Sequence, residues 1–293
     1  MERWGRRLAF GIGVVLLLVV GLALLLRWAP GMMGLEMKPE DANQWFEAQG
    51  LPVPEWGTAA GPERNVGFVR AGRRGGPLVL FIHGSPGGWS AWQGYLAHPE
   101  LRQMDLVAVD RPGYGRSGAG RVLPSVDGQA QHIAAVLEMV AAGRRAVVVG
   151  HSLGGPIAGR LAMLFPDLVK GLLLIAPSVD PELEETKWFQ RLALWPGVRA
   201  LVPPDLEVCN LEILPLETQL ESIEPGWAKL RVPTVVLQGT VDTLVPPGNG
   251  AFIEARLPGA DVIFLEGVDH FIPWSKPELV RRHVRALALG DGG

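Results

Sequence analysis

The chain has 293 residues, of which 48% are hydrophobic and 19% charged, with a formal net charge of -3. This length supports a large core, and a single α/β domain commonly runs to roughly 200–250 residues. The balanced charge gives no electrostatic basis for binding nucleic acid, so no nucleic-acid partner is expected. The single cysteine, Cys209, excludes an internal disulfide and a metal site built from cysteines. The six histidines lack the i,i+4 pairing of a helical zinc site, so no metal is predicted.

The N-terminus carries an apolar run, residues 8–26, without a charge or a proline. As a helix this run is about 28 Å long, close to the roughly 30 Å hydrocarbon core of a bilayer. Arg3, Arg6 and Arg7 precede it, whereas only Arg27 follows it closely. Arginine and lysine residues that flank a membrane-spanning helix are enriched on its cytoplasmic side. The run therefore predicts a single-pass membrane anchor, residues 1–29, with a cytoplasmic N-terminus and the folded domain on the periplasmic or extracellular side.

Two other interpretations of this run are a cleaved signal peptide and a buried core helix. The apolar part of a signal peptide usually has about 7–15 residues and ends at an A-x-A-like site. The run is longer than that, and the following "LRWAPGMMG" lacks such a site. An uncharged run at the extreme terminus is also unusual for a core helix. We therefore favour a retained signal-anchor.

Residues 30–64 are rich in glycine, proline, methionine and tryptophan. They predict a juxtamembrane connector with one short helix over residues 39–49, which lies either on the domain or on the lipid surface.

From residue 65 onward, apolar runs typical of strands alternate with helical patterns. The strand candidates are "VGFVRAG", "PLVLFIHG", "DLVAVDRPG", "RAVVVGHS", "VKGLLLIAP", "VPTVVLQGTVD" and "ADVIFLEGVDH". Several are continuously apolar, as in strands buried on both faces of a parallel sheet. The helix candidates are residues 126–142, 153–165, 250–257 and 277–289. This alternation predicts a doubly wound α/β core formed by residues 65–177 and 232–293.

An insertion, residues 178–231, interrupts the alternation, and its prolines divide it into short helices. Sheets of this class bind ligands outside the carboxyl ends of their strands, where this insertion begins. We predict a helical cap in which Trp188, Phe189 and Trp195 bind substrate. The same aromatic side chains could instead form a small core of the insertion itself.

The stretch Gly150-His151-Ser152-Leu153-Gly154 matches the nucleophile elbow G-x-S-x-G between a strand and a helix. A sharp turn there strains the central residue, and bulky neighbours would clash. The turn lifts the serine hydroxyl to the N-terminus of a helix, whose partial positive charge favours an oxyanion. Ser152 is the predicted nucleophile.

A serine needs a general base, and His270 follows the last strand run. Asp242, after the preceding strand run, is the predicted carboxylate that orients it. Asp180 is the competing acid, and Asp269 would point the other way along an extended segment. The order Ser152, Asp242, His270 places all three at carboxyl ends of strands, which meet at one edge of a parallel sheet.

The glycine-rich stretch "HGSPGG" follows the first long buried strand. A tetrahedral intermediate needs backbone donors, and we predict an oxyanion hole made by the amides of Leu153 and Ser85. His83 is more simply a structural histidine that bonds to the loop backbone. A phosphate site is not favoured, because no lysine follows in P-loop spacing. In "DRPGYGRSG", Asp110 and Arg111 are expected to fix the loop by hydrogen bonds.

Together, "HGSPGG", "DRPGYGRSG", "GHSLGG", "GTVDTLVP" and "DHF" resemble the α/β-hydrolase fold superfamily over residues 65–289. The resemblance implies an eight-stranded, mostly parallel sheet with helices on both faces and a short cap. It also implies a Ser152–Asp242–His270 triad and no cofactor. Haloalkane dehalogenases and epoxide hydrolases of this fold use an aspartate nucleophile, so the serine does not favour them.

The expected function is a membrane-anchored serine hydrolase that cleaves carboxylic esters of apolar or lipid-like substrates through an acyl-enzyme. Alternatives on the same scaffold are an aminopeptidase, a C–C bond hydrolase and a cofactor-free perhydrolase. "HGSPGG" is similar to the equivalent loop of proline iminopeptidases, and Glu182, Glu184 and Glu185 could then bind a substrate amine. A catalytically silent binding module is the remaining alternative, although every triad residue is present.

Overall fold

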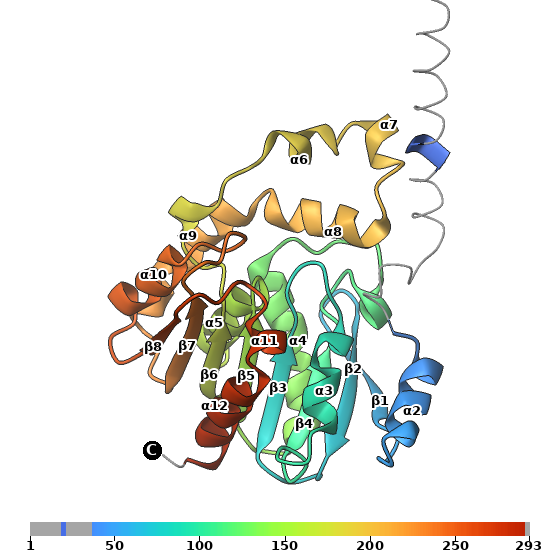
Figure 1. Cartoon of the computed structure of the whole chain (residues 1–293), viewed down its shortest axis with the longest axis vertical. Coiled ribbons are helices and arrows are strands. Elements are labelled where there is room, and N and C mark those ends of the chain that lie inside the picture. Colours follow the sequence, from blue (N-terminus) through green and yellow to red (C-terminus); the bar gives the residue numbers. More distant parts are fainter. Residues whose placement is uncertain (1–18, 22–36, 291–293) are drawn as a thin grey trace, which may run out of the picture.

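The computed structural model of the chain describes residues 19–21 and 37–290. Its centre is one eight-stranded sheet in the order β1-β2-β4-β3-β5-β6-β7-β8, with helices packed on both faces (Figure 1). The strands are β1 (Glu55–Ala60), β2 (Asn65–Gly72), β3 (Leu78–Ile82), β4 (Asp105–Val109), β5 (Ala146–His151), β6 (Val169–Ile175), β7 (Thr234–Gly239) and β8 (Asp261–Leu265).

The helices alternate with the strands along the chain, as the sequence pattern predicts. They are α2 (Pro39–Ala48), α3 (Gln93–Ala97), α4 (Val126–Ala141), α5 (Gly154–Leu164), α6 (Trp188–Leu192), α7 (Pro196–Arg199), α8 (Pro204–Ile213), α9 (Leu216–Trp227), α10 (Gly248–Arg256), α11 (Ile272–Ser275) and α12 (Pro277–Leu289). Three short 3-10 turns are η1 (Trp89–Trp92), η2 (Gly115–Ser117) and η3 (Pro181–Leu183).

The sheet is parallel from β4 to β8, and β2 pairs antiparallel with both β1 and β4. All residues of β3, β4 and β5 are buried, which explains their continuous apolar runs, because helices cover both faces of the sheet. The predicted eight-stranded, mostly parallel architecture is confirmed.

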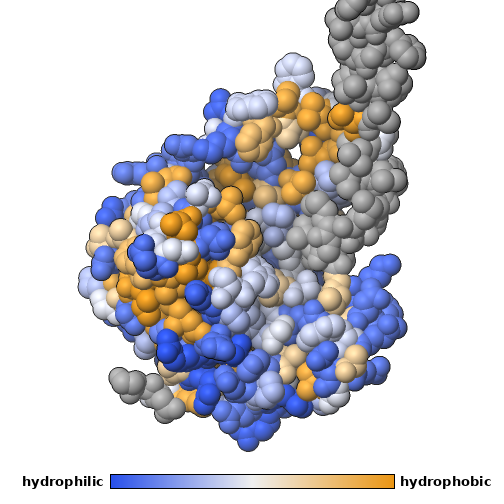
Figure 2. All heavy atoms as spheres, viewed as in Figure 1, coloured by the Kyte–Doolittle hydropathy of each residue, from blue (hydrophilic) through white to orange (hydrophobic). Residues whose placement is uncertain are grey.

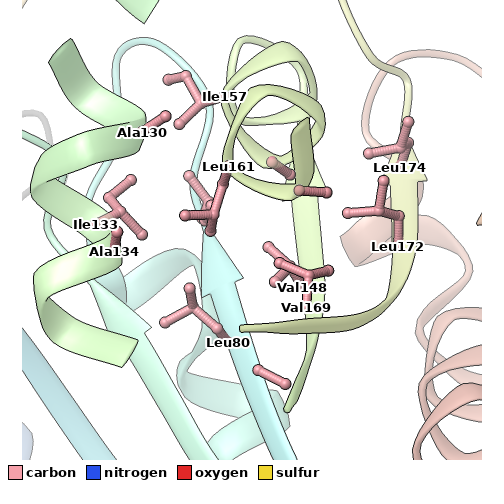
Figure 3. Packing of buried hydrophobic residues seen from close by; sticks show 14 of the residues in the cluster. Leu80, Ala130, Ile133, Ala134, Val148, Ile157, Leu161, Val169, Leu172 and Leu174 are labelled. Carbon is pink, nitrogen blue, oxygen red and sulfur yellow. The ribbon is translucent and has the colours of Figure 1, made fainter. Parts of the chain in front are cut away.

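The hydrophobic core has two layers, one on each face of the sheet. Leu80 and Val148 point to the face covered by α4 and α5, where they meet Ile133, Ile157 and Leu161 (Figure 3). Their neighbours along the same strands, such as Phe81 and Val149, belong to the core on the other face, which includes residues of α3 and α12. This alternation follows from the two-residue period of a strand.

The predicted connector, residues 30–64, differs from the structure in one respect. Its residues 55–60 form β1, which pairs with β2 from Glu55 opposite Arg70 to Ala60 opposite Asn65. The sheet therefore begins ten residues before the predicted core. The sequence did not indicate this strand, because a six-residue run that contains Gly57 and Thr58 has little apolar character. The helix expected over residues 39–49 is present as α2, and its buried Ala42 and Phe46 pack on the domain core.

The insertion, residues 178–231, has two structural parts. The helices α6, α7 and α8 lie above the carboxyl edge of the sheet as a cap (Figure 1). The last helix, α9, belongs instead to the core, because its buried Trp227 packs against α5 at Gly159. A Cβ atom on Gly159 would lie 2.2 Å from the Trp227 ring, so only a glycine permits this approach.

The predicted membrane anchor, residues 8–26, lies outside the described residues except at positions 19–21. Within the described ranges, no helix combines the length and the apolar character required to cross a bilayer.

Candidate active site

The serine of the G-x-S-x-G stretch sits on a tight turn between β5 and α5. Ser152 has a φ of 55°, a left-handed conformation that is rare for a residue other than glycine. Its amide donates to the carbonyl of Ile175 at 3.0 Å, which ties the turn to the end of β6. The strained backbone expected of a nucleophile elbow is therefore present at Ser152.

The two flanking glycines are required by close backbone contacts. A Cβ atom on Gly150 would lie 2.3 Å from the carbonyl oxygen of Gly154. A Cβ atom on Gly154 would lie 2.5 Å from the carbonyl oxygen of Ile82. A side chain at Gly150 would push α5 away from β5, and one at Gly154 would push the turn away from β3, so the motif spacing follows from packing as well as from chemistry.

Asp242 and His270 are in direct contact at the carboxyl ends of β7 and β8. The Nδ1–H of His270 donates to Oδ2 of Asp242 at 2.7 Å, and both residues are buried. The other oxygen of Asp242 accepts from the amides of Leu244 and Val245 at 2.9 and 2.8 Å. These two bonds fix the orientation of the carboxylate. Because Nδ1 of His270 carries the proton that bonds to Asp242, Nε2 is the nitrogen able to accept a proton.

The two competing acids have other partners. Asp180 begins η3 and accepts from the amide of Glu182 at 3.0 Å. Asp269 accepts from the amide of Phe271 at 3.0 Å and is exposed. The structure therefore pairs His270 with Asp242 rather than with Asp180 or Asp269.

His151 links Ser152 to His270, and the sequence reasoning gave it no role. Its Nε2–H donates to the carbonyl of His270 at 3.1 Å, and the two rings lie 4.7 Å apart between centroids. The pKa of His151 is lowered from 6.5 to about 3, mainly by burial and further by the electrostatic effect of the nearby His270. His151 is thus a neutral support that holds the segment of His270 against the elbow. Its position directly before Ser152 was the only signal in the sequence.

The oxyanion loop, residues 83–88, follows β3 and touches the elbow. A Cβ atom on Gly84 would lie 2.9 Å from the Cβ atom of Ser152. The expected oxyanion donors, the amides of Ser85 and Leu153, flank this contact. Within the described part of the chain, neither amide donates a hydrogen bond to a protein group.

His83 holds the oxyanion loop through backbone contacts, as expected of a structural histidine. Its Nε2 accepts from the amide of Arg111 at 2.9 Å, so its Nδ1–H donates to the carbonyl of Gly84 at 2.7 Å. Burial, with a further contribution from the Arg111 charge, lowers the pKa of His83 well below 6.5. A neutral ring suits this donor-and-acceptor role.

Asp110 and Arg111 fix the neighbouring loops, also as expected. The carboxylate of Asp110 accepts from the amides of Trp89 and Arg116 at 2.9 and 3.0 Å. The guanidinium of Arg111 donates to the carbonyls of His83 and Gly84, each at 3.0 Å. It also forms a buried ion pair with Glu212 of the cap, a residue that the sequence reasoning did not identify.

The aromatic residues predicted to bind substrate lie on the cap and face solvent. The exposed fractions of Trp188, Phe189 and Trp195 are 76%, 55% and 68%. Figure 2 shows further apolar residues gathered over the cap in the upper part of the view. None of the three contacts Asp242 or His270, so their predicted role stays a prediction.

Among the residues described, no group of three histidine, cysteine, aspartate or glutamate side chains could hold a metal ion. The chemistry that this arrangement can perform is acyl transfer: a strained, half-buried serine, a histidine oriented by a carboxylate, and two backbone donors beside them.

Comparisons with known proteins give matches of the same kind. A family model of the alpha/beta hydrolase fold matches residues 77–208. The chain is 29% identical to monoacylglycerol lipase ABHD6 of Homo sapiens over 175 residues, which are 59% of this chain and 50% of that protein. It is 34% identical to epoxide hydrolase 4 of Mus musculus over 120 residues, 39% of this chain and 33% of that protein. The matched region thus spans half or less of these two relatives.

Solved structures resemble the chain over most of its length. Carboxylesterase CesB (YbfK) from Bacillus subtilis has a TM-score of 0.62 at 16% identity, covering 86% of this chain and 97% of that one. Haloalkane dehalogenase DbeA from Bradyrhizobium elkani has a TM-score of 0.63 at 20% identity, covering 81% and 98%. At such identities the likeness establishes the shared fold, and the chemistry has to be argued from the site.

Proposed function

We propose that this chain, which has the α/β-hydrolase fold, is a serine hydrolase that cleaves carboxylic esters through an acyl-enzyme on Ser152. Its curated relatives include a lipase and epoxide hydrolases, which confirms the predicted class of hydrolases. The observation that carries the proposal is the buried Asp242–His270 pair beside the strained elbow that presents Ser152.

The acylation step uses the residues as follows. His270 Nε2 removes the proton from the Ser152 hydroxyl while Oγ attacks the ester carbonyl carbon. The carbonyl oxygen becomes negative and receives hydrogen bonds from the amides of Ser85 and Leu153. The C–O bond to the alcohol then breaks, and the imidazolium of His270 gives its proton to the leaving alkoxide. Asp242 stabilises that imidazolium and holds its Nδ1–H in place.

The deacylation step repeats this chemistry with water. His270 accepts a proton from the water, whose oxygen attacks the acyl carbon of the Ser152 ester. The tetrahedral intermediate collapses, the acid leaves, and His270 returns the proton to Ser152. Positioned proton transfer of this kind contributes about 10²–10⁴ in rate.

We propose apolar or lipid-like acyl groups as substrates. The exposed Trp188, Phe189 and Trp195 of the cap support this assignment, because an apolar substrate that contacts them would remove apolar surface from water. The epoxide hydrolases among the relatives do not displace the proposal, since a serine stands where their reaction needs an aspartate.

We also propose that residues 8–26 anchor the chain in a membrane, with the catalytic domain on the periplasmic or extracellular side. The three arginines before the run and the single one after it support this orientation. A C-terminal reporter that functions only outside the cytoplasm should be active. Activity of a cytoplasm-restricted reporter at the same position would contradict the orientation.

The test of the catalytic proposal is labelling of the full chain with a fluorophosphonate probe, which reacts with activated serines. The wild type should be labelled and Ser152→Ala should not. Ser178→Ala is a matched control, because Ser178 lies beside the elbow and its amide donates to the carbonyl of Ser152. Turnover of p-nitrophenyl esters from acetate to laurate would define the acyl preference. A folded wild type without labelling or turnover would refute the proposal.

A further inference from the structure

A carboxylate of the cap is buried inside the catalytic domain. Glu212 lies in the last turn of α8, and its side chain is fully buried. A glutamate is almost never fully buried unless other groups pair with it. Its partners therefore indicate what the residue does.

The charge of Glu212 is balanced by Arg111. The two side chains meet at 2.8 Å (Oε1 to Nη1) and 3.1 Å (Oε2 to Nη2), a bidentate arrangement. Gln129 of α4 donates to the same Oε1 at 2.7 Å. One face of the carboxylate is thus fixed by groups of the catalytic domain.

The other oxygen of Glu212 reaches the oxyanion loop. Oε2 accepts from the hydroxyl of Ser85 and from that of Tyr114, each at 2.7 Å. Arg111 also holds this loop, through the carbonyls of His83 and Gly84. Residues 83–85 are consequently bound both by a cap carboxylate and by the core guanidinium that pairs with it.

The carboxylate has no capacity left for a ligand. Two carboxylate oxygens offer about four acceptor positions, and five donated hydrogen bonds already fill them. Glu212 therefore does not bind the amine of a peptide substrate.

We propose that Glu212 is a positioning residue: by holding the Ser85 side chain, it sets the direction of the Ser85 amide toward the oxyanion. The cap then acts on catalysis as well as on substrate access, since α8 contributes a residue that completes the oxyanion hole. This proposal rests on the proposed acyl-transfer function. A displacement of about 1 Å in such a group can lower a rate about 10²-fold.

The test compares Ser85→Ala, Glu212→Gln and the control Glu221→Gln, an exposed glutamate of α9. Ser85→Ala removes the contacts of the Ser85 hydroxyl with Glu212 and with the Tyr114 hydroxyl, whereas the Ser85 amide and the Arg111–Glu212 pair remain. We expect kcat for a short ester to fall about tenfold with KM within about twofold, in a variant that is folded at the assay temperature but less stable, because a buried carboxylate has lost one hydrogen bond. The affinity for a trifluoromethyl ketone, which forms a tetrahedral oxyanion on serine, should fall in parallel with kcat.

Glu212→Gln disturbs more of the site, and we expect a decrease in kcat of about 10²-fold. It also leaves the buried Arg111 without its counter-charge, so this variant is less stable, and Ser85→Ala decides the question if it does not fold. Glu221→Gln should match the wild type in every measurement.

The proposal is overturned if folded Ser85→Ala keeps the wild-type kcat and ketone affinity. It is equally overturned if only KM rises, because that result would assign Glu212 to substrate binding. A wild type that neither turns over esters nor reacts with fluorophosphonate would refute the proposed function itself, a distinct result from active wild type with unaffected variants.

Discussion

The Nδ1–H of His270 donates to the carboxylate of Asp242, 28 positions earlier in the sequence, across 2.7 Å and so connects the segments that follow β8 and β7. Because the Asp242 carboxylate is held by two amides of the segment that follows β7, it has one orientation, and the imidazole has one tautomer. Several consequences of this arrangement can be measured.

Asp242→Asn should lower kcat about 10³–10⁴-fold, since an amide NH₂ in place of the acceptor favours the wrong tautomer of His270. The measurement is steady-state kinetics with an ester that wild type hydrolyses. Asp180→Asn is the control and should retain near-wild-type activity, because Asp180 only begins η3. Loss of activity in Asp180→Asn with an active Asp242→Asn would reverse the assignment of the acid.

The neutral state of His151 should make the protein less stable in acid. Its pKa is about 3 in the folded state against 6.5 when unperturbed. Below pH 6.5 the unfolded chain binds a proton that the native chain does not, so stability falls as the pH falls toward 3. The expected loss is up to roughly 1.4 kcal/mol per pH unit. Urea unfolding at about pH 7 and about pH 5 measures it.

The matched variant for that experiment is His151→Gln, whose side-chain amide can still donate to the carbonyl of His270. It should lose less stability between the two pH values than wild type. His83, also buried and neutral, continues to contribute in both proteins. Equal losses in the two proteins would show that His151 does not carry this dependence.

The backbone strain at Ser152 predicts that Ser152→Gly is more stable than Ser152→Ala. A φ of 55° is unfavourable for any residue with a Cβ atom, and glycine adopts it freely. The expected difference in the free energy of unfolding is about 1 kcal/mol. Both variants lack the nucleophile, so chemical denaturation compares them without interference from turnover. A more stable alanine variant would mean that the turn is not strained.

Trp227→Ala should destabilise the protein by about 3–5 kcal/mol, because the indole is fully buried against α5. The control is Trp195→Ala, at an exposed cap position, for which a change within about 0.5 kcal/mol is expected. Urea unfolding checks both. Similar small changes at the two positions would indicate that α9 is a surface element, like the start of α7 where Trp195 lies, rather than part of the core.

Several elements of the fold could be predicted because their signals are local. The buried strands β3 and β5 read as continuous apolar runs, and α12 coincides with the predicted residues 277–289. The strand β1 was missed because Glu55–Ala60 carries little apolar character, and it becomes a strand only by pairing with β2.

The residues of the site likewise divide into those with a local sequence signal and those without one. The elbow around Ser152 is a local motif, and the places of Asp242 and His270 follow from the rule that parallel strands end at one edge. Glu212 gave no signal, because it lies within a helix of the insertion where a glutamate usually faces solvent.

The amino-acid sequence by itself determined the order of the core strands from β2 onward, the elbow and the set of groups at the carboxyl edge, because these depend on the periodicity of neighbouring residues and on turn chemistry. Only the tertiary structure decided that α9 belongs to the core and that Glu212 of the cap clamps the oxyanion loop. Both depend on contacts between residues 68 or more positions apart, such as Trp227 with Gly159 and Glu212 with Arg111. Such contacts arise from the packing of whole elements, which no local pattern encodes.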